Sequence, residues 1–334
     1  MSGLVPRAVS LFGFGLYLLA SAAGAYADDS VTIGTDWRAE ASHGGIYEAQ
    51  AAGIYKKYHL NVTIVQGGPN LNQAQLLAAG HYDFIVSSNS FEPLNFVQNN
   101  VPIVVVAAGF QKDPQVLIAH QGVGNDRLEA MKGKPIMISS DARPSYWQFL
   151  RVKFGFSDDQ IRPYNYSLQP FLVDKKAIVQ GYLTDEPYAI ELASGEKPVT
   201  ILLADHGYKS YAEFIATTEA NIDSKPDVVQ RFVTATMEGW KQYLHGDPTG
   251  ANDLIKKDNP EMTDAILAHS RAGIIAGGLV ESGDAINLGI GAMTDSRWQE
   301  FADFAIGAGI FPKDIAYKKA YTLRFLSTKT AAAP

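Results

Sequence analysis

Strand-like and helix-like segments alternate along the first part of the chain. Short apolar runs rich in β-branched residues are separated by segments whose apolar positions recur at helical spacing. The pattern predicts helices at 43–58 and 71–79, and strands at 31–35, 61–66, 82–87, 102–110 and 115–120. Because strands joined by crossover helices pair in parallel, this order predicts an α/β fold with a mainly parallel sheet.

A second cycle of the same kind begins near Lys134, and helices alone follow it. Its predicted helices are 144–154, 171–179 and 187–195, and its strands are 135–140, 161–166, 181–184, 199–205 and 213–218. Later helices are predicted at 226–244, 249–258, 262–276 and 296–306. Two cycles predict two lobes, the first formed by residues 28–117 with 217–330 and the second by residues 118–216. The chain is expected to cross between them near 117–121 and 211–217.

The turns that follow the strands are the candidate site, because ligands bind outside the carboxyl ends of strands in open parallel sheets. Trp37 directly follows the first strand, and His43 opens the first helix, where free backbone N–H groups suit polar ligand atoms. Trp37 offers a flat face for stacking, and Gly44 and Gly45 let a ligand approach the backbone closely. The alternative is that Trp37 packs between the lobes and His43 only caps the helix.

Polar and aromatic side chains occupy two further turns. Those after the third strand suit hydrogen bonds to a polar ligand or a helix cap, and they are Ser87, Ser88 and Asn89. The candidates in the second lobe are Ser140, Arg143, Tyr146 and Trp147. One of these two aromatic residues is expected in the core, and Arg143 is expected to pair with an anionic ligand group or with Asp141.

The segment GYLTDEPYAIE, residues 181–191, gives the sharpest local signal. Glu186 stands just before Pro187, which opens a helix after a strand, and the helix dipole stabilises a carboxylate there. Such a carboxylate accepts hydrogen bonds from an amino group or a ring N–H, whereas Asp185 is expected to cap the helix. The alternative is that Glu186 is itself only a cap.

Composition and charge exclude several classes of function. The 334 residues carry a formal net charge of -7, which argues against nucleic acid as a partner. The absence of cysteine excludes disulfides, thiolate metal sites and Cys nucleophiles. The sequence has no GxSxG, no HExxH and no dense cluster of His, Asp and Glu. We therefore predict no catalytic residue, no metal and no cofactor.

Residues 1–27 are predicted to be a cleaved signal peptide. Arg7 precedes an apolar run that ends near Ala20, and Ala25-Tyr26-Ala27 is a small-x-small cleavage site. The alternative is an uncleaved anchor, although the run is short and Gly-rich for a membrane span. The mature chain is expected to begin near Asp28 and to act in the periplasm.

Five motifs together carry a family resemblance. They are W-x5-H-x2-I-Y-x-A-x3-G-I-Y-x3-H-L-x-V at 37–62, L-x-A-G-x-Y-D-F at 77–84, MKGKPIMIS at 131–139, GYLTDEPYAIE at 181–191 and KPDVVQRFVTATMEGWKQYL at 225–244. The chain resembles the NMT1/THI5-like branch of the periplasmic substrate-binding components of ABC importers, which is shared with taurine, sulfonate and nitrate binders. The resemblance implies a monomeric two-lobe clamshell, a type II periplasmic-binding-protein fold, which closes on a ligand and delivers it to a membrane permease.

The resemblance also implies a ligand. Pyrimidine binders of this family use a Trp after the first strand and an acidic residue before the Pro of an E-P segment, and these correspond to Trp37 and Glu186. A thiamine pyrimidine precursor, such as hydroxymethylpyrimidine or its formylamino or aminomethyl derivative, would stack on Trp37 or Tyr188, with Glu186 accepting its amino protons. The alternatives within this class are riboflavin, another nucleobase-like ring, and taurine or another alkanesulfonate.

Two alternatives from other classes remain. Fungal members of the family are pyrimidine synthases that need a Lys, a nearby His and a cysteine-rich iron motif. This chain has Ser87 and Phe91 at the corresponding Lys and His positions and has no cysteine, so synthase activity is not expected. A sensor subunit would instead signal ligand binding to a membrane receptor.

Overall fold

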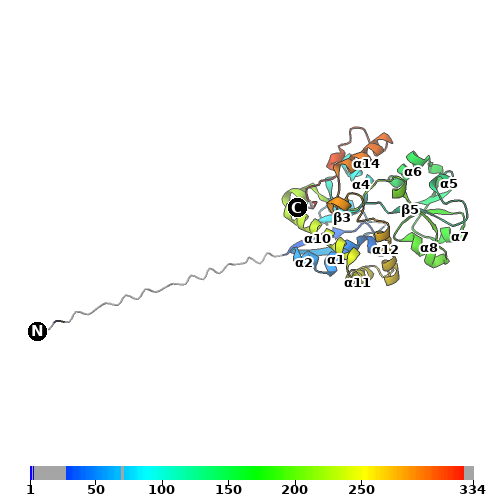
Figure 1. The fold of residues 1–334 in the computed structure, drawn as a ribbon. Helices are drawn as coiled ribbons and strands as arrows, with labels where there is room; N and C mark the ends of the chain where they lie inside the picture. The colour runs from blue at the N-terminus through cyan, green and yellow to red at the C-terminus, as the bar shows by residue number, and fades with distance from the viewer. Residues whose placement is uncertain (2, 4–27, 69–70, 327–334) are drawn as a thin grey trace.

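Two five-stranded sheets form two lobes in the computed structural model, which describes residues 1, 3, 28–68 and 71–326 (Figure 1). The first sheet has the order β2(Leu60–Val65)-β1(Asp29–Gly34)-β3(Phe84–Asn89)-β10(Ala212–Thr218)-β4(Ile103–Phe110). The second has the order β7(Ile161–Pro163)-β6(Ile136–Ile138)-β8(Ile178–Tyr182)-β5(Gln115–Ala119)-β9(Val199–Leu202). The predicted signal peptide lies outside the described residues, apart from residues 1 and 3.

Each sheet is mainly parallel, with one strand running against its neighbours. In the first sheet β1 pairs in parallel with β2 and β3, whereas β10 is antiparallel to β3 and β4. In the second, β6 pairs in parallel with β7 and β8, whereas β5 is antiparallel to β8 and β9. The odd strand of each sheet is therefore the one that the chain forms directly after crossing from the other lobe. The predicted α/β two-lobe fold is confirmed.

The predicted lobe boundaries cut through two strands and need correction. Residues 115–119 all belong to β5 of the second sheet, and residues 212–218 all belong to β10 of the first. The crossings lie earlier than predicted, at 111–114 and between Leu202 and Ala212. The apolar runs are correct as strands, but hydrophobicity alone does not tell which of two buried sheets a strand joins.

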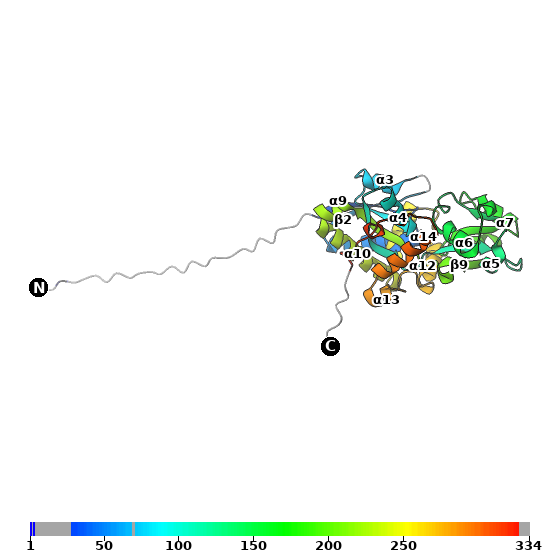
Figure 2. The same ribbon diagram turned by 90° about the horizontal axis from the view of Figure 1, so that it is seen from above.

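Helices cover both sheets (Figure 1). In the first lobe they are α1(Gly44–Ala51), α2(Ile54–Lys57), α3(Gln73–Ala78), α4(Phe91–Gln98), α9(Glu219–Ser224), α10(Pro226–His245), α11(Thr249–Asp258), α12(Asp264–Ala276), α13(Ala285–Leu288) and α14(Asp295–Gly307). In the second they are α5(Leu128–Met131), α6(Tyr146–Phe154), α7(Gln169–Val173) and α8(Glu186–Ser194). Figure 2 shows the second lobe at one end of the molecule, beside the larger first lobe. None of the helices among the described residues is long and apolar enough to cross a membrane.

Local backbone chemistry explains where the predicted helices were wrong. The helix predicted at 43–58 is interrupted at Gly53, whose φ of 69° is left-handed and ends α1 before α2 begins. The helix predicted at 171–179 stops at Val173, and β8 already begins at Ile178. Helix α4 had not been predicted, because its apolar positions directly follow a strand of similar composition.

The glycine pair after β1 serves helix packing. A Cβ on Gly44 would lie within 3.0 Å of the Tyr243 ring, and one on Gly45 within 3.0 Å of the Trp240 ring. Both aromatic rings belong to α10 and are fully buried. The prediction that this pair lets a ligand approach the backbone is therefore wrong, because α10 already occupies the space.

Gly45→Ala is expected to lower the free energy of unfolding by about 2 kcal/mol, since the added methyl group overpacks the contact with Trp240. Urea denaturation of both proteins measures the difference. Gly273→Ala is the matched control, because a Cβ at that helical position meets nothing within 4 Å. Equal losses of stability in the two variants would contradict the packing role of Gly45.

Candidate functional site

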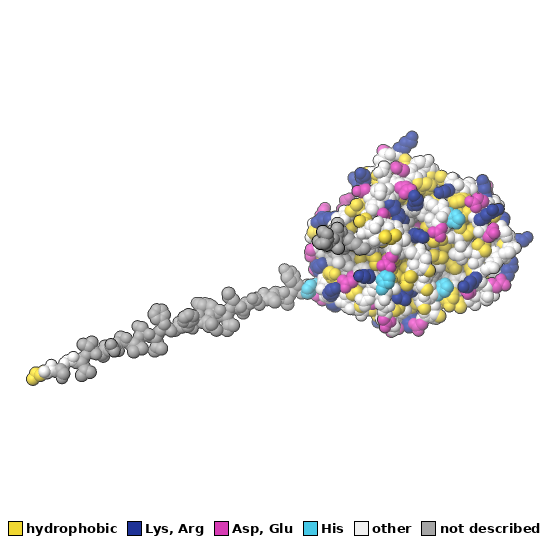
Figure 3. Space-filling model, viewed as in Figure 1, with side chains coloured by type: hydrophobic (Ala, Val, Ile, Leu, Met, Phe, Trp, Pro, Cys, Tyr) yellow, Lys and Arg dark blue, Asp and Glu magenta, His cyan; other side chains and the backbone are white. Residues whose placement is uncertain are grey.

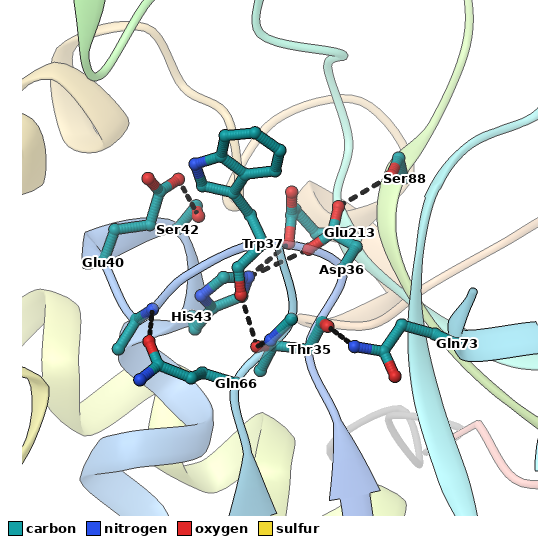
Figure 4. Close-up of polar contacts among 12 residues, drawn as sticks. Thr35, Asp36, Trp37, Glu40, Ser42, His43, Gln66, Gln73, Ser88 and Glu213 are labelled. Atoms are coloured by element: carbon teal, nitrogen blue, oxygen red, sulfur yellow. Dashed lines mark hydrogen bonds and ion pairs between the residues drawn. The ribbon is translucent and has the colours of Figure 1, made fainter. Parts of the chain in front are cut away.

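The loop after β1 is held in place by hydrogen bonds to its own backbone (Figure 4). The Thr35 hydroxyl donates to the Trp37 backbone carbonyl at 2.7 Å. The side-chain oxygen of Gln66 accepts the Ala39 N–H at 3.1 Å. Gln73 donates to the Thr35 carbonyl at 2.6 Å. These contacts fix a loop that leaves Trp37 half-buried at the edge of the first lobe.

Asp36, His43 and Glu213 form a cluster at the carboxyl end of β1 (Figure 4). His43 Nε2 lies 2.9 Å from Asp36 Oδ1 and 3.8 Å from Glu213 Oε2. The Ser88 hydroxyl donates to the other Asp36 oxygen at 2.6 Å. Burial alone would raise the pKa of Asp36, but the hydrogen bonds and charge of His43, with the Ser88 bond, leave it below its usual value.

Glu186 lies across from this cluster, in the second lobe. Its Oε2 accepts the backbone N–H of Tyr182 at 2.7 Å, at the start of α8. Gly181 makes room for it, because a Cβ there would lie 2.9 Å from the Glu186 Cβ. Burial, followed by the nearby charge of Asp185, raises the pKa of Glu186 to about 8. The nearby hydroxyl of Tyr164 lowers this pKa in part.

The two lobes touch across this region. The Tyr182 hydroxyl donates to Glu213 Oε1 at 3.2 Å, and the rings of Trp37 and Tyr166 lie 4.8 Å apart. Tyr188 of α8 stacks on His269 of α12, with ring centroids 3.9 Å apart.

One cavity lies between the lobes, and it measures about 10 Å³. It is lined by Glu40, Ala41, Thr184, Asp185, Met262, Ile266 and Ser270. That volume holds roughly one water molecule, so an aromatic ligand enters this part of the cleft only when the lobes move apart.

The facing surfaces of the lobes are acidic and aromatic. Five carboxyls lie in or beside the cleft, and they belong to Asp36, Glu40, Asp185, Glu186 and Glu213. Burial and then neighbouring carboxylates raise the pKa of Glu40 and Glu213 well above the usual range. Within the described part of the chain, no lysine or arginine forms an ion pair with any of the five. The cleft therefore favours a cation or a group rich in N–H donors.

The polar residues predicted after β3 have partners within the protein. The Ser87 hydroxyl donates to Glu92 at 2.7 Å, and the same Glu92 oxygen accepts the Ser88 N–H at 3.0 Å. The side-chain carbonyl oxygen of Asn89 accepts the Phe91 N–H at 3.1 Å, so Asn89 stabilises a local turn. Only Ser88 reaches the cluster, through Asp36.

The candidates in the second lobe separate into two groups. Both predicted aromatic residues lie in the core, although only one was expected there: the Tyr146 side chain is buried, its hydroxyl donates to Gln180 at 2.8 Å, and burial, then the charge of Asp141, raises its pKa. Trp147 is fully buried, and its indole donates to Asp158 at 2.9 Å.

Arg143 and Trp147 line a pocket of about 330 Å³, together with Gln148, Asp158 and Ile161. All of these belong to the second lobe, so this pocket does not lie between the lobes. Ser140 and Arg143 are exposed. The structure thus does not join Arg143, Trp147 or Ser140 to the acidic cluster.

Sequence reasoning missed Asp36, Glu40, Tyr166, Tyr182 and Glu213. One signal for Glu213 was present, since it is a lone carboxylate in the apolar strand AEFIATT. Its φ of 50° is left-handed, and it is not among the Cα pairs of β10 with either neighbouring strand, although the register is the same on both sides of it. Gly109 permits this backbone, because a Cβ there would lie 2.5 Å from the Glu213 carbonyl oxygen. Such strain is typical of functional positions.

The arrangement of two lobes, each with a mainly parallel sheet and one antiparallel strand, is the fold of periplasmic binding proteins. The crystal structure of the periplasmic aliphatic sulphonate binding protein SsuA from Escherichia coli has this fold, with a TM-score of 0.66, 13% identity, and coverage of 92% of this chain and 96% of that one. A model of the family described as NMT1/THI5 like matches residues 40–251. The chain belongs to this family, and the resemblance noted in the sequence is confirmed.

Two curated relatives are more similar in sequence. The riboflavin-binding protein RibY of Chloroflexus aurantiacus is 24% identical over 69% of this chain and 66% of that protein. A putative thiamine biosynthesis protein of Haemophilus influenzae is 22% identical over 88% of this chain and 92% of that protein.

Proposed function

We propose that this protein is the extracytoplasmic solute-binding component of an ABC importer, and that its ligand is a small aromatic heterocycle bearing N–H donors. A thiamine pyrimidine precursor is the leading candidate. The observation that carries the proposal is the acidic and aromatic cleft: Trp37 meets Tyr166 of the other lobe, and Glu186 lies on that lobe beside Tyr182, whose hydroxyl reaches Glu213. The ring would stack on Trp37, and a carboxyl oxygen of Glu186 would accept a hydrogen bond from its amino group, which this oxygen can do with or without the proton that the raised pKa of Glu186 favours.

The same cleft argues against the sulfonate alternative. A sulfonate needs several N–H donors or a basic side chain, whereas the polar side chains of this cleft are mainly carboxyls, and none of them pairs with a lysine or arginine of the described residues. The riboflavin alternative fits the aromatic walls, and its ring N–H would also suit Glu186. The names of the two curated relatives, one for riboflavin and one for thiamine biosynthesis, agree with a heterocyclic ligand.

The partner in this function is a membrane permease that receives the ligand from the closed lobes, and the protein acts as a monomer in the periplasm. Figure 3 shows acidic and basic side chains interspersed on one face, which suits a freely diffusing protein. The binding function needs no catalytic residue. Turnover of a bound pyrimidine, detected by a change in its mass, would overturn the non-enzymatic assignment.

A thermal-shift panel tests the ligand class. It contains hydroxymethylpyrimidine, its aminomethyl and formylamino derivatives, riboflavin, purines, taurine, an alkanesulfonate and nitrate. A true ligand at a hundred times its Kd stabilises the protein by about 2.7 kcal/mol, and we expect this for a pyrimidine. Glu186→Gln should lose the shift, and the exposed Glu196→Gln, just past the same helix, should keep it. A shift with taurine or the alkanesulfonate alone would reject the heterocycle.

A further inference from the structure

The cluster of Asp36, His43 and Glu213 is not explained by the heterocycle alone. Its three residues come from the loop after β1, the turn before α1 and the start of β10, so the fold brings together residues far apart in the sequence. The His43 side chain is completely buried, and those of Asp36 and Glu213 are 16% and 4% exposed. Two carboxyls and an imidazole are thus buried together, and none of the lysines and arginines at 28–68 or 71–326 pairs with them.

Two atoms of this cluster are buried without a hydrogen-bond partner among the described residues. They are Glu213 Oε2 and His43 Nδ1. Glu213 Oε2 points toward His43 Nε2, at a distance of 3.8 Å. A buried carboxyl oxygen without a hydrogen-bond partner is costly, and a metal cation between the two side chains would satisfy it and displace any proton that it carries.

The spacing of the facing atoms suits a tetrahedral metal ion. The distances from His43 Nε2 are 2.9 Å to Asp36 Oδ1 and 3.8 Å to Glu213 Oε2, and the three ligand atoms all lie within 4.8 Å of one another. Ligands at about 2.0–2.1 Å from a tetrahedral ion stand roughly 3.3 Å apart, which lies between these two distances.

The remaining oxygens are fixed as they are in built metal sites. Asp36 Oδ2 accepts the Ser88 hydroxyl at 2.6 Å, and Glu213 Oε1 accepts the Tyr182 hydroxyl at 3.2 Å. Each carboxylate is therefore oriented by a hydroxyl through one oxygen, while its other oxygen faces His43. Such outer partners set the direction of the ligands.

We propose that Asp36, His43 and Glu213 together bind one Zn²⁺ ion in the cleft. Zn²⁺ favours this mixture of nitrogen and carboxylate oxygen, and two carboxylates balance its charge when the imidazole is neutral. Three protein ligands leave the fourth tetrahedral position to an atom of the bound solute. The inference deepens the proposed function, since it places the ion at the base of the same cleft, but it rests on different residues from the stacking and carboxylate pair.

Isothermal titration with Zn²⁺ alone tests this site in protein freed of metal by a chelator that is then removed. We expect one ion per chain. His43→Gln and Glu213→Gln should each weaken binding at least about tenfold. His245→Gln is the matched control, because His245 is an exposed histidine 2.8 Å from Glu281, a pair that also offers nitrogen and oxygen ligands. It should leave the affinity unchanged.

Three results would overturn the site: no binding, binding unaffected in both cluster variants, or binding lost in His245→Gln. Thermal melts without metal check that the variants are folded. If the variants fail to fold, the wild-type protein titrated with Co²⁺ still tests the site. Co²⁺ bound in a tetrahedral site gives strong visible absorption, and we expect this absorption to disappear when Zn²⁺ displaces the Co²⁺. Repeating the heterocycle panel in chelator separates the two proposals, because a pyrimidine shift retained there, together with no Zn²⁺ binding in the titration, rejects the metal site alone.

Discussion

Asp113→Asn is expected to stabilise the protein at pH 8, by up to about 4 kcal/mol relative to the wild type, and to have little effect at pH 4. Asp113 lies at the first crossing between the lobes and is 1% exposed. Burial raises the pKa of its carboxyl from 3.8 to about 7, although the Gln115 N–H and the nearby hydroxyls of Ser210 and Tyr208 lower it in part.

The sign follows from proton binding. Below pH 3.8 the carboxyl is protonated in both states, so its burial carries no ionisation cost. Between pH 3.8 and about 7 the unfolded chain releases the proton and the folded protein retains it, so stability falls as the pH rises. Above about 7 the folded state is ionised too, and the loss is complete. The asparagine amide has no such dependence.

Urea denaturation at pH 4, 6 and 8 measures the difference between the two proteins. Asp205→Asn is the control for loss of one negative charge, because Asp205 lies at the second crossing, is 59% exposed and contacts Lys112 at 3.2 Å. A stability difference between Asp113→Asn and wild type that stays constant over this range would show that the Asp113 carboxyl is not held protonated by burial.

The positions of Trp37, His43 and Glu186 could be predicted from the sequence, because each stands in a turn directly after a strand. That rule depends only on local periodicity and on the carboxyl ends of parallel strands. The structure places Trp37 against Tyr166 of the other lobe, His43 in the buried cluster with Asp36, and Glu186 at the start of α8. Their contact with a ligand stays a prediction.

Glu213 and Tyr166 could not be predicted in this way. Glu213 lies within a strand, and its position beside His43 depends on β10 returning from the second lobe to pair with β3. Tyr166 follows the short strand β7 and meets Trp37 only because the two lobes approach each other. Both contacts depend on tertiary pairing, which single-sequence periodicity does not contain.

The glycine pair and Ser87 show that a sequence can indicate a close or polar contact without revealing which group makes it. The sequence correctly indicated that small residues were needed at Gly44 and Gly45, but the neighbour was α10 and not a ligand. Likewise Ser87 had a hydrogen-bond partner nearby in Glu92, which stands only five residues later. Residue type shows that a close or polar contact is required, whereas its partner is decided by packing.

Gln180→Met is expected to destabilise the protein by about 3 kcal/mol or more, because it removes the acceptor of three buried donors. The side-chain oxygen of Gln180 accepts the Ser139 N–H at 2.7 Å, the Ser139 hydroxyl at 3.0 Å and the Tyr146 hydroxyl at 2.8 Å. Ser139 and Tyr146 are 1% and 2% exposed, so water does not replace this acceptor. Methionine keeps nearly the same volume, which leaves the lost hydrogen bonds as the main effect.

Tyr146→Phe is the matched variant, since it removes one donor and leaves the acceptor with two others. We expect it to cost about 1 kcal/mol, and the double variant to lose less than the sum of the single losses. Urea denaturation of the four proteins gives this cycle. The same network fixes the turn after β6, next to Tyr166, whose hydroxyl donates to Asp141 at 2.8 Å. A loss in Gln180→Met no greater than that in Tyr146→Phe would mean that the Ser139 donors find another partner, and that Gln180 does not hold this wall of the cleft.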